Sequence, residues 1–150
     1  IIKYYILYMV LDEVGYYGPN ILDGANIIFF GIFYKQLWLY IILGILLNRL
    51  LNGVLKQIFR VKRQEQIPFY GHIAKCYAMP SGHTQSVTYA TTLMYFFNIY
   101  VFAIFLFVTL CTMRQRYVYR NHTIPQIIIG GIVGVCAAIF TIFFIKQKVN

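Results

Sequence analysis

The sequence predicts an all-α fold, a polytopic membrane bundle of about five transmembrane helices. Three observations support this prediction: hydrophobic residues make up 60% of the 150 residues, charged residues only 11%, and uncharged apolar runs recur along the chain. A soluble domain would have too few polar side chains to cover so much apolar surface. A helix needs about 20 apolar residues to cross a bilayer, and several of the runs approach that length.

The last span is the clearest one. It is the uncharged run Ile127–Ile145, in which Gly130, Gly134 and Ala138 recur at every fourth position. This spacing places the three small residues on one stripe of a helix. Small residues let neighbouring membrane helices approach closely, so the stripe predicts a packing surface for another span.

The uncharged run Thr84–Met113 is longer than one span requires. Its 30 residues would form a helix of about 45 Å. We therefore expect two short helices, Thr84–Phe97 and Ile99–Met113, separated by a tight turn at Asn98. A single tilted helix is the alternative.

The N-terminal half predicts one further span and two shorter segments. Leu37–Phe59 is rich in Leu and Ile and long enough to cross the bilayer. Ile27–Tyr34 predicts a short first helix, which an interfacial Lys35 separates from that span. Ile1–Leu11 is rich in Tyr and too short to cross, so we expect it to lie along the membrane interface.

These spans also predict a topology. Residues 60–80 and 114–125 emerge on one side of the membrane, whereas Lys35, Asn98 and the lysines that follow the last span lie on the other side. The polar stretches described below can therefore meet at one place.

The charge balance predicts an anionic partner. Thirteen Lys and Arg residues against four Asp and Glu residues give a net charge of +9, which favours lipid headgroups or phosphate. Nucleic acid is disfavoured, because the basic residues alternate with long apolar runs. We expect no metal, no cofactor and no disulfide framework, because the acidic and cysteine residues are scattered. These residues are Asp12, Glu13, Asp23, Glu65, Cys76, Cys111 and Cys136.

The first polar stretch contains Lys56 and Arg63. On a continuing helix they would share one face with Arg60, because seven residues make two turns. Three cations on one stripe repel one another unless an anion compensates. Arginine suits phosphate because its planar fork donates two parallel hydrogen bonds. By itself, the stretch is equally typical of a positive collar that touches lipid headgroups.

The second stretch is the turn Pro80-Ser81-Gly82-His83 in front of a helical pattern. Ser81 is a good N-cap, and Gly82 lets the backbone come close to a ligand. The N–H groups and the positive end of the helix can then face an anion. By itself, the stretch is also typical of an ordinary turn.

The third stretch places Arg116 six residues before His122, at the start of the last span. Gln126 follows four residues later and can hydrogen-bond a ring nitrogen, which would fix the tautomer of His122. Two histidines beside several cations support a coherent reaction. One neutral imidazole attacks phosphorus and forms a phosphohistidine, the other protonates the departing oxygen, and the cations stabilise the charge on the phosphoryl oxygens.

The three stretches resemble, in order and spacing, the signature motifs of the type 2 phosphatidic acid phosphatase (PAP2) superfamily, which is related to the vanadium haloperoxidases. The resemblance covers Leu37–Ile145. It implies a PAP2-like membrane catalytic domain over residues 27–150, after an interfacial or truncated segment over residues 1–26. It implies a lipid phosphatase with His122 as the nucleophile and His83 as the acid for the leaving group. The phosphate-binding residues that it implies are Lys56, Arg63, Ser81, Gly82 and Arg116.

Three positions depart from the general family pattern. Gln64 replaces a proline, Gln115 a serine, and Gln126 the aspartate that orients the nucleophile. An amide orients an imidazole but stabilises its cation less than a carboxylate does. The runs Tyr77–Gln85 and His122–Gln126 resemble the dolichyldiphosphatases, a branch with glutamine at the last position. This resemblance implies hydrolysis of a polyprenyl (dolichyl) diphosphate to the monophosphate on the lumenal face of the endoplasmic reticulum.

Alternatives remain open for the substrate, the activity and the location. The rival substrates are phosphatidic acid, an undecaprenyl-type diphosphate and a sphingoid phosphate. The rival function is a catalytically inactive PAP2-like scaffold or lipid-binding protein, which the three glutamines and the short chain favour. The abundance of Ile, Tyr, Phe and Asn is typical of an AT-rich genome, so a virion or a virus-derived internal membrane is the alternative location.

Overall fold

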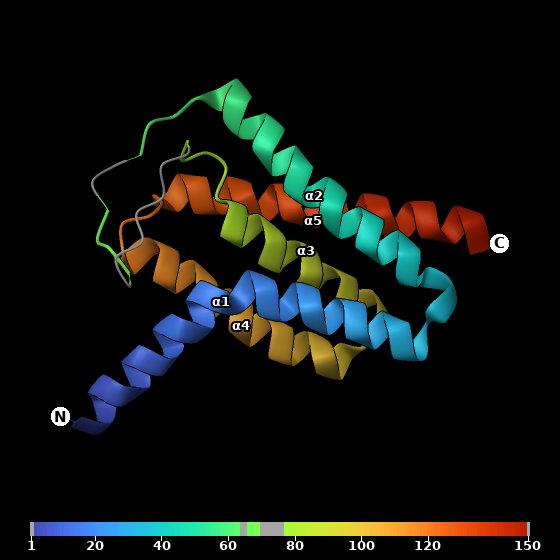
Figure 1. Cartoon of the computed structure of the whole chain (residues 1–150), viewed down its shortest axis with the longest axis horizontal. Helices are drawn as coiled ribbons and strands as arrows, with labels where there is room; N and C mark the ends of the chain where they lie inside the picture. The colour runs from blue at the N-terminus through green and yellow to red at the C-terminus, as the bar shows by residue number, and fades with distance from the viewer. Residues whose placement is uncertain (1, 64–65, 70–76, 150) are drawn as a thin grey trace.

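The structure is a computed structural model, and it describes residues 2–63, 66–69 and 77–149. Its helices are α1 (Ile2–Phe33), the short 3-10 helix η1 (Lys35–Leu37), α2 (Trp38–Phe59), α3 (Gly82–Phe97), α4 (Ile99–Val118) and α5 (Ile124–Val149). Figure 1 shows the long helices arranged as a bundle. The predicted all-α fold is therefore confirmed.

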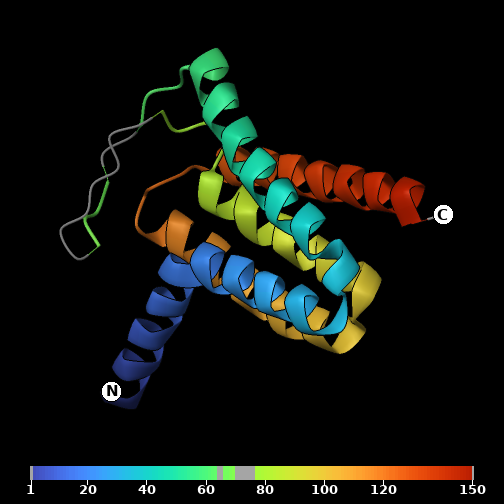
Figure 2. The same cartoon turned by 45° about the vertical axis from the view of Figure 1, so that its right-hand side comes forward.

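The bundle is organised around α3. Among the described residues, α2 together with η1, α4 and α5 are long and apolar enough to cross a membrane. α3 has only 16 residues, but it contacts α1, α2, α4 and α5 and lies among them in Figures 1 and 2. Its side chains Val87, Tyr89, Ala90, Leu93 and Met94 are fully buried. Burial on all sides also encloses polar side chains of α3, and Gln85, Thr88 and Thr91 each form hydrogen bonds within the bundle.

α1 differs from the predicted short segments, because it is one helix from Ile2 to Phe33. The expectation of a separate short helix over Ile27–Tyr34 is wrong, and the division between residues 26 and 27 falls within this helix. Pro19 lies inside α1, where its ring crowds the preceding turn and removes one hydrogen bond. Figures 1 and 2 show the first part of α1 leaving the bundle at an angle, which this proline explains.

Two glycines bring the middle of α1 against α4. A Cβ atom at Gly15 would clash with the Cys111 carbonyl, and one at Gly18 would clash with the Thr112 hydroxyl. The two helices therefore pack backbone against backbone, as membrane helices with small interface residues do. This contact brings residues of the predicted N-terminal segment to the centre of the protein.

The predicted turn at Asn98 is confirmed. Asn98 ends α3, where its N–H donates to the Met94 carbonyl at 2.8 Å. Its side-chain Oδ1 also begins α4, because it accepts from the N–H groups of Tyr100 and Val101, each at 3.0 Å. One residue thus satisfies backbone groups at the ends of two helices, which allows so tight a turn.

α4 continues five residues beyond its predicted end and includes Arg116 in its last turn. A cation is favourable there, because it faces the negative end of the helix dipole. The described parts of the α2–α3 and α4–α5 loops lie at one end of the bundle, whereas η1, the α3–α4 turn and the last turns of α5 lie at the other end (Figure 1). This arrangement agrees with the predicted meeting of the polar stretches, and the side of the membrane on which they lie stays a prediction.

The small-residue stripe of α5 packs against α3, as predicted. A Cβ atom at Gly130 would lie 2.6 Å from the Ser81 carbonyl oxygen. One at Gly134 would clash with the Thr88 hydroxyl and the Gln85 carbonyl, and Ala138 is fully buried. Since α3 carries the Ser81 turn, this interface sets the position of that turn relative to α5.

The Gly134→Ala substitution is expected to destabilise the bundle by about 1–3 kcal/mol, because the added methyl group overpacks the α3–α5 interface. Gly53→Ala is the matched control, because Gly53 is also helical and a Cβ atom there meets nothing within 4 Å. The control should be neutral or stabilising by up to about 1 kcal/mol. Thermal unfolding in detergent measures both variants, and equal effects of the two would contradict this packing.

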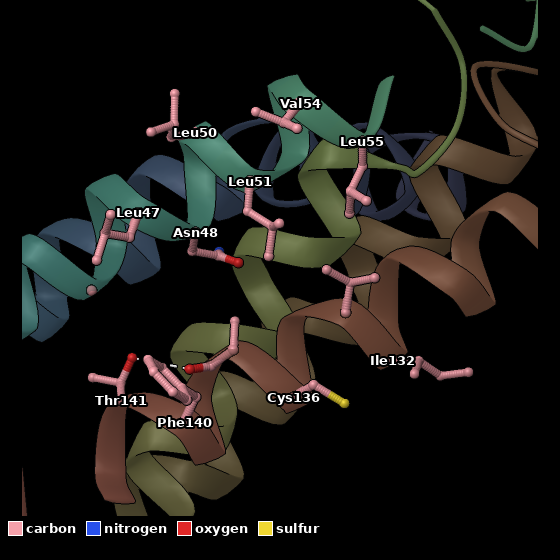
Figure 3. A pocket seen from close by; sticks show the side chains of 13 residues that line it. Leu47, Asn48, Leu50, Leu51, Val54, Leu55, Ile132, Cys136, Phe140 and Thr141 are labelled. Atoms are coloured by element: carbon pink, nitrogen blue, oxygen red, sulfur yellow. Dashed lines mark hydrogen bonds between the residues drawn. The ribbon is translucent and has the colours of Figure 1, made fainter. Parts of the chain in front are cut away.

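A groove of about 680 Å³ separates α2 from α5 along part of their length. Figure 3 shows its walls, which are mainly aliphatic, with Leu47, Leu51 and Val54 on α2 and Ile132 and Phe140 on α5. An apolar groove between two spans fits the hydrocarbon chains of membrane lipids.

Candidate active site

The first cationic stretch leaves the helix earlier than predicted. α2 ends at Phe59, because Arg60 adopts a left-handed conformation with φ of 49°. Arg63 therefore lies in an extended segment, and the expectation that Lys56, Arg60 and Arg63 share one helical face is wrong. The change of direction at Arg60 separates cations that would repel one another on one stripe.

Arg63 nevertheless reaches the predicted nucleophile. Its Nη1 donates to the Asn121 carbonyl at 2.8 Å and lies 3.5 Å from His122 Nε2. The extended segment is held in place by a 2.8 Å hydrogen bond from the Ala78 N–H to the Val61 carbonyl. The first and third stretches therefore meet, as predicted, but through a loop rather than a helix.

His122 is buried in the short loop between α4 and α5. Its Nδ1 lies 3.3 Å from Gln126 Oε1, which also accepts from the Thr123 N–H at 3.1 Å. An amide oxygen only accepts, so this network assigns the ring proton to Nδ1 and leaves a lone pair on Nε2. That tautomer is the one that a nucleophilic Nε2 requires.

Ser81 caps α3, as predicted. Its Oγ accepts from the Thr84 N–H at 3.5 Å, and its own N–H donates to the Gln126 carbonyl at 3.2 Å. Gly82 begins the helix, and a Cβ atom there would lie 2.8 Å from Asn52 Oδ1. The glycine is therefore required for close packing on α2, a reason that the sequence pattern did not reveal. The first N–H groups of α3 have no partner within the helix and carry its positive end.

Three amide side chains, to which the sequence assigned no role, hold the start of α3 against α2. Asn52 Nδ2 donates to Gln85 Oε1 at 2.8 Å, and Gln85 Nε2 donates to Asn48 Oδ1 at 2.9 Å. Gln85 and Asn48 are buried, where an unpaired amide would be costly. The network fixes the Ser81 turn relative to Lys56, which lies one helical turn beyond Asn52.

Arg116 is buried and held from two sides. Its Nε donates to Gln115 Oε1 at 2.6 Å, and its guanidinium lies over the Tyr16 ring, 5.4 Å from the centroid. Its Nη2 is buried and has no hydrogen-bond partner among the described residues. A buried donor without a partner is costly, so the geometry favours an anion as the partner of this nitrogen.

His83 lies in the first turn of α3, and its ring is 6.2 Å from the Tyr16 ring. Burial, followed by the positive charge of Arg116, lowers the pKa of His83 from 6.5 to about 3. The charges of His122, Lys56 and Arg63 also lower this pKa. The structure therefore brings both histidines and all three cations to one end of the bundle.

The environment of His122 keeps its ring neutral. Burial, followed by the positive charge of Arg63, lowers the pKa of His122 from 6.5 to about 3. Lys56 and Arg116 also lower this pKa, whereas the hydrogen bond with Gln126 raises it. A neutral imidazole at pH 7 has the lone pair that a nucleophile needs.

An oxyanion in the site is expected to raise the pKa of His122, because it neutralises the cations that now lower it. Without an anion, the His122 signal in an NMR titration of labelled histidine should not shift above about pH 4. Saturating sulfate, a tetrahedral dianion, should move the titration toward its ordinary value, and His122→Gln assigns the signal. Titration near pH 6.5 without any anion would contradict the proposed environment.

The lowered pKa of His122 also makes the stability of the protein depend on pH. Unfolded His122 binds a proton near pH 6.5, whereas the folded residue does so only near pH 3. Its contribution to stability is therefore complete above pH 6.5 and is lost as the pH falls toward 3.

Tyr16 of α1 also belongs to the site, although no motif in the sequence marked it. Tyr16 contacts both Arg116 and His83. One helical turn earlier, Asp12 joins α1 to α4, because it pairs with Arg114 and accepts from the Tyr119 hydroxyl at 3.0 Å. Gln64, Glu65 and Cys76, for which the sequence raised expectations, lie outside the described residues.

A helical bundle with two histidines and three cations at one end is the arrangement expected of an integral-membrane phosphatase. Residues 37–149 match the model of the PAP2 superfamily, and the chain belongs to this superfamily. The predicted enzyme class, a membrane lipid phosphatase, is therefore confirmed.

Two solved structures have the same fold. The transmembrane PAP2-type phosphatidylglycerolphosphate phosphatase from Bacillus subtilis is 19% identical, with a TM-score of 0.73 over 96% of this chain and 78% of its own. LpxE from Aquifex aeolicus is 21% identical, with a TM-score of 0.68 over 91% of this chain and 86% of its own. None of the curated proteins is detectably similar in sequence. The particular resemblance to dolichyldiphosphatases stays a prediction.

Proposed function

We propose that the protein hydrolyses a polyprenyl diphosphate, or a related lipid phosphate, through a phosphohistidine on His122. The observation that carries the proposal is the buried Arg116 Nη2 without a partner among the described residues, at the site where Lys56 and Arg63 act on the same histidine. Phosphate is the ligand that matches these donors, because an arginine fork binds its oxygens at two points.

The reaction follows from the roles of the two rings. His122 Nε2 attacks the terminal phosphorus, while Lys56, Arg63 and Arg116 stabilise the charge on its oxygens. Phosphate bound among the cations raises the pKa of His83, so that the ring is protonated and donates a proton to the departing oxygen. Water then attacks the phosphohistidine, gives its proton back to His83 and releases phosphate. Ser81 and Gly82 contribute the N-terminal end of α3 to the phosphate site.

The glutamines that favoured an inactive scaffold have positions that support an enzyme. Gln126 Oε1 lies 3.3 Å from the nucleophile's Nδ1, and Gln115 Oε1 accepts from Arg116 Nε at 2.6 Å. Both amides therefore orient groups that an inactive protein would have no reason to orient.

We further propose the endoplasmic reticulum as the location, with the site on the lumenal face. The support is the topology: the C-terminal lysines lie at the opposite end of the bundle from the site, and cytosolic ends are enriched in lysine. A virion or virus-derived membrane remains the alternative.

A panel of lipid phosphates tests the proposal. Purified protein in detergent micelles with EDTA is given dolichyl diphosphate, phosphatidate and a sphingoid phosphate, and phosphate release is measured. We expect turnover in EDTA, fastest with the diphosphate. Absence of phosphate release from every lipid, by a protein that unfolds cooperatively, would instead support the scaffold.

A further inference from the structure

A polar pocket of 260 Å³ opens beside His83 and includes residues of α1, α2 and α3. Its polar lining residues are Asn20, Arg49, Asn52, His83 and Ser86. His122 lines a separate pocket of 580 Å³ at the start of α5. The attacking and leaving groups of a phosphoryl transfer lie roughly in line. A phosphoryl group attacked from the His122 side therefore loses its leaving group toward the pocket of His83.

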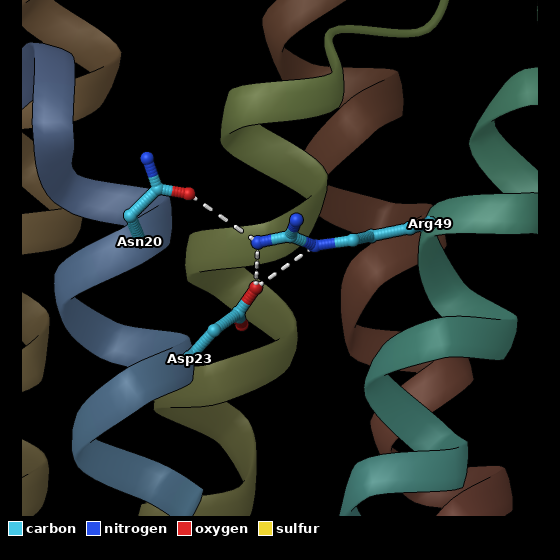
Figure 4. Close-up of polar contacts among 3 residues, drawn as sticks. All are labelled: Asn20, Asp23 and Arg49. Carbon is cyan, nitrogen blue, oxygen red and sulfur yellow. Dashed lines mark hydrogen bonds and ion pairs between the residues drawn. The ribbon is translucent and has the colours of Figure 1, made fainter.

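Arg49 is the cation of this polar pocket beside His83, and it belongs to none of the three signature motifs. Its Nη2 and Nε donate to one oxygen of Asp23, at 2.6 Å and 3.1 Å, and its Nη2 lies 3.5 Å from Asn20 Oδ1. Figure 4 shows Nη1 pointing away from Asp23, toward the end of α3 where the chain enters that helix. The Arg49 side chain is 48% exposed, whereas that of Asp23 is 7% exposed. Arg49 can therefore bind a second anion through Nη1.

The depth of Arg49 matches the place of the leaving group. Arg49 lies three residues before Asn52 on α2, which is about 4.5 Å along the helix, and Asn52 touches Gly82 at the start of α3. Arg49 is therefore about one turn further into the membrane than the start of α3. The hydrocarbon chain of a lipid substrate must also run in that direction, so the lipid side of the broken bond lies toward Arg49.

The charge of the leaving group distinguishes two substrate classes. A lipid monophosphate leaves as a neutral alcohol, whereas a lipid diphosphate leaves as a phosphate monoester with a charge of about −1.5 to −2. A cation within a membrane span is costly and usually functional. We propose that Arg49 binds the departing phosphate of a lipid diphosphate and so gives the enzyme its preference for diphosphates. This inference rests on the proposed function.

The transfer step balances with this assignment. The bond between His122 Nε2 and the terminal phosphorus forms as the bond from that phosphorus to the bridging oxygen breaks. The electron pair stays on the bridging oxygen, which takes the proton of His83, and Arg49 binds the other oxygens of the departing monophosphate. Water then supplies the hydroxyl group that releases the terminal phosphate from His122.

The test compares a polyprenyl diphosphate with the monophosphate of the same chain, in wild type, Arg49→Gln, Asp23→Asn and the double variant. The double variant removes both charges of the ion pair, so neither partner is left buried and unpaired. We expect Arg49→Gln to lower kcat/KM for the diphosphate at least tenfold and to leave the monophosphate within about twofold. The double variant should behave in the same way, whereas Asp23→Asn should retain or increase the diphosphate rate.

Four results would overturn the assignment. Equal losses for both substrates in Arg49→Gln and in the double variant, or a loss in Asp23→Asn that matches Arg49→Gln, would mean that the ion pair only joins α1 to α2. Wild-type activity on the monophosphate alone would refute the role of Arg49 and leave a lipid phosphatase. Wild-type inactivity on both, and on the phosphatidate and sphingoid phosphate of the panel, would refute the proposed function itself, and the role of Arg49 with it.

Discussion

Replacing His122 by alanine is expected to reduce lipid-phosphate release by about 10⁴-fold, because the substitution removes the atom that bonds to phosphorus. The loss should appear in kcat, since Lys56, Arg63 and Arg116 remain to bind the substrate. A second readout is covalent. Wild-type protein quenched in alkali during turnover of ³²P-labelled substrate should retain acid-labile label, and the variant should retain none.

Thr123→Ala is the matched control for this substitution. Thr123 is the next residue, and its described contact in the site is the backbone N–H that donates to Gln126 Oε1, which alanine keeps. Activity within about threefold of wild type is expected, because alanine keeps this backbone hydrogen bond and Thr123 is only half-buried. Full activity of His122→Ala, or label that persists in it, would exclude the phosphohistidine.

Replacing Arg116 by glutamine is expected to lower kcat/KM by about 10²–10³-fold, the usual cost of losing one donor to the charge that develops in the transition state. Arg116→Lys should recover little of the loss. Lysine donates from a single nitrogen, so it cannot keep both the bond to Gln115 and a contact with the phosphate.

Arg114→Gln separates phosphate binding from general effects of charge. Arg114 lies two residues earlier on α4, and it pairs with Asp12 and lies over the Tyr8 ring, 5.2 Å from its centroid. We expect this variant to lose some thermal stability but to keep kcat/KM within about threefold. Equal losses in the Arg114 and Arg116 variants would mean that net charge, rather than the Arg116 guanidinium, supports turnover.

Much of the fold could be predicted because membrane helices are determined by local composition. The uncharged runs predicted the spans, Asn98 predicted the break between α3 and α4, and the spacing of Gly130 and Gly134 predicted the packing of α5. Each of these features depends on the length, polarity or size of residues close together in the sequence. Helix ends were predicted less well, because the end of α2 depends on the backbone of Arg60, and α4 continues through residues that read as a loop.

The site could be predicted only for the residues that belong to the three sequence motifs. Lys56, Arg63, His83, Arg116 and His122 were marked by their spacing at the ends of apolar runs. Tyr16 and the pair of Arg49 with Asp23 were not, because their partners lie on other helices. No periodic pattern relates residues so far apart in sequence.

The amino-acid sequence by itself therefore determined the helical bundle, the end of it at which the polar stretches meet, and the chemical groups there, since these follow from hydrophobicity and residue type. Only the tertiary structure decided that α1 is a single helix that contributes to the site, that Gln115 and Gln126 contact Arg116 and His122, and that Arg49 lines one pocket with His83. The physical reason is that hydrogen bonds and ion pairs require separations of about 3 Å, and the packing of distant helices alone sets these separations.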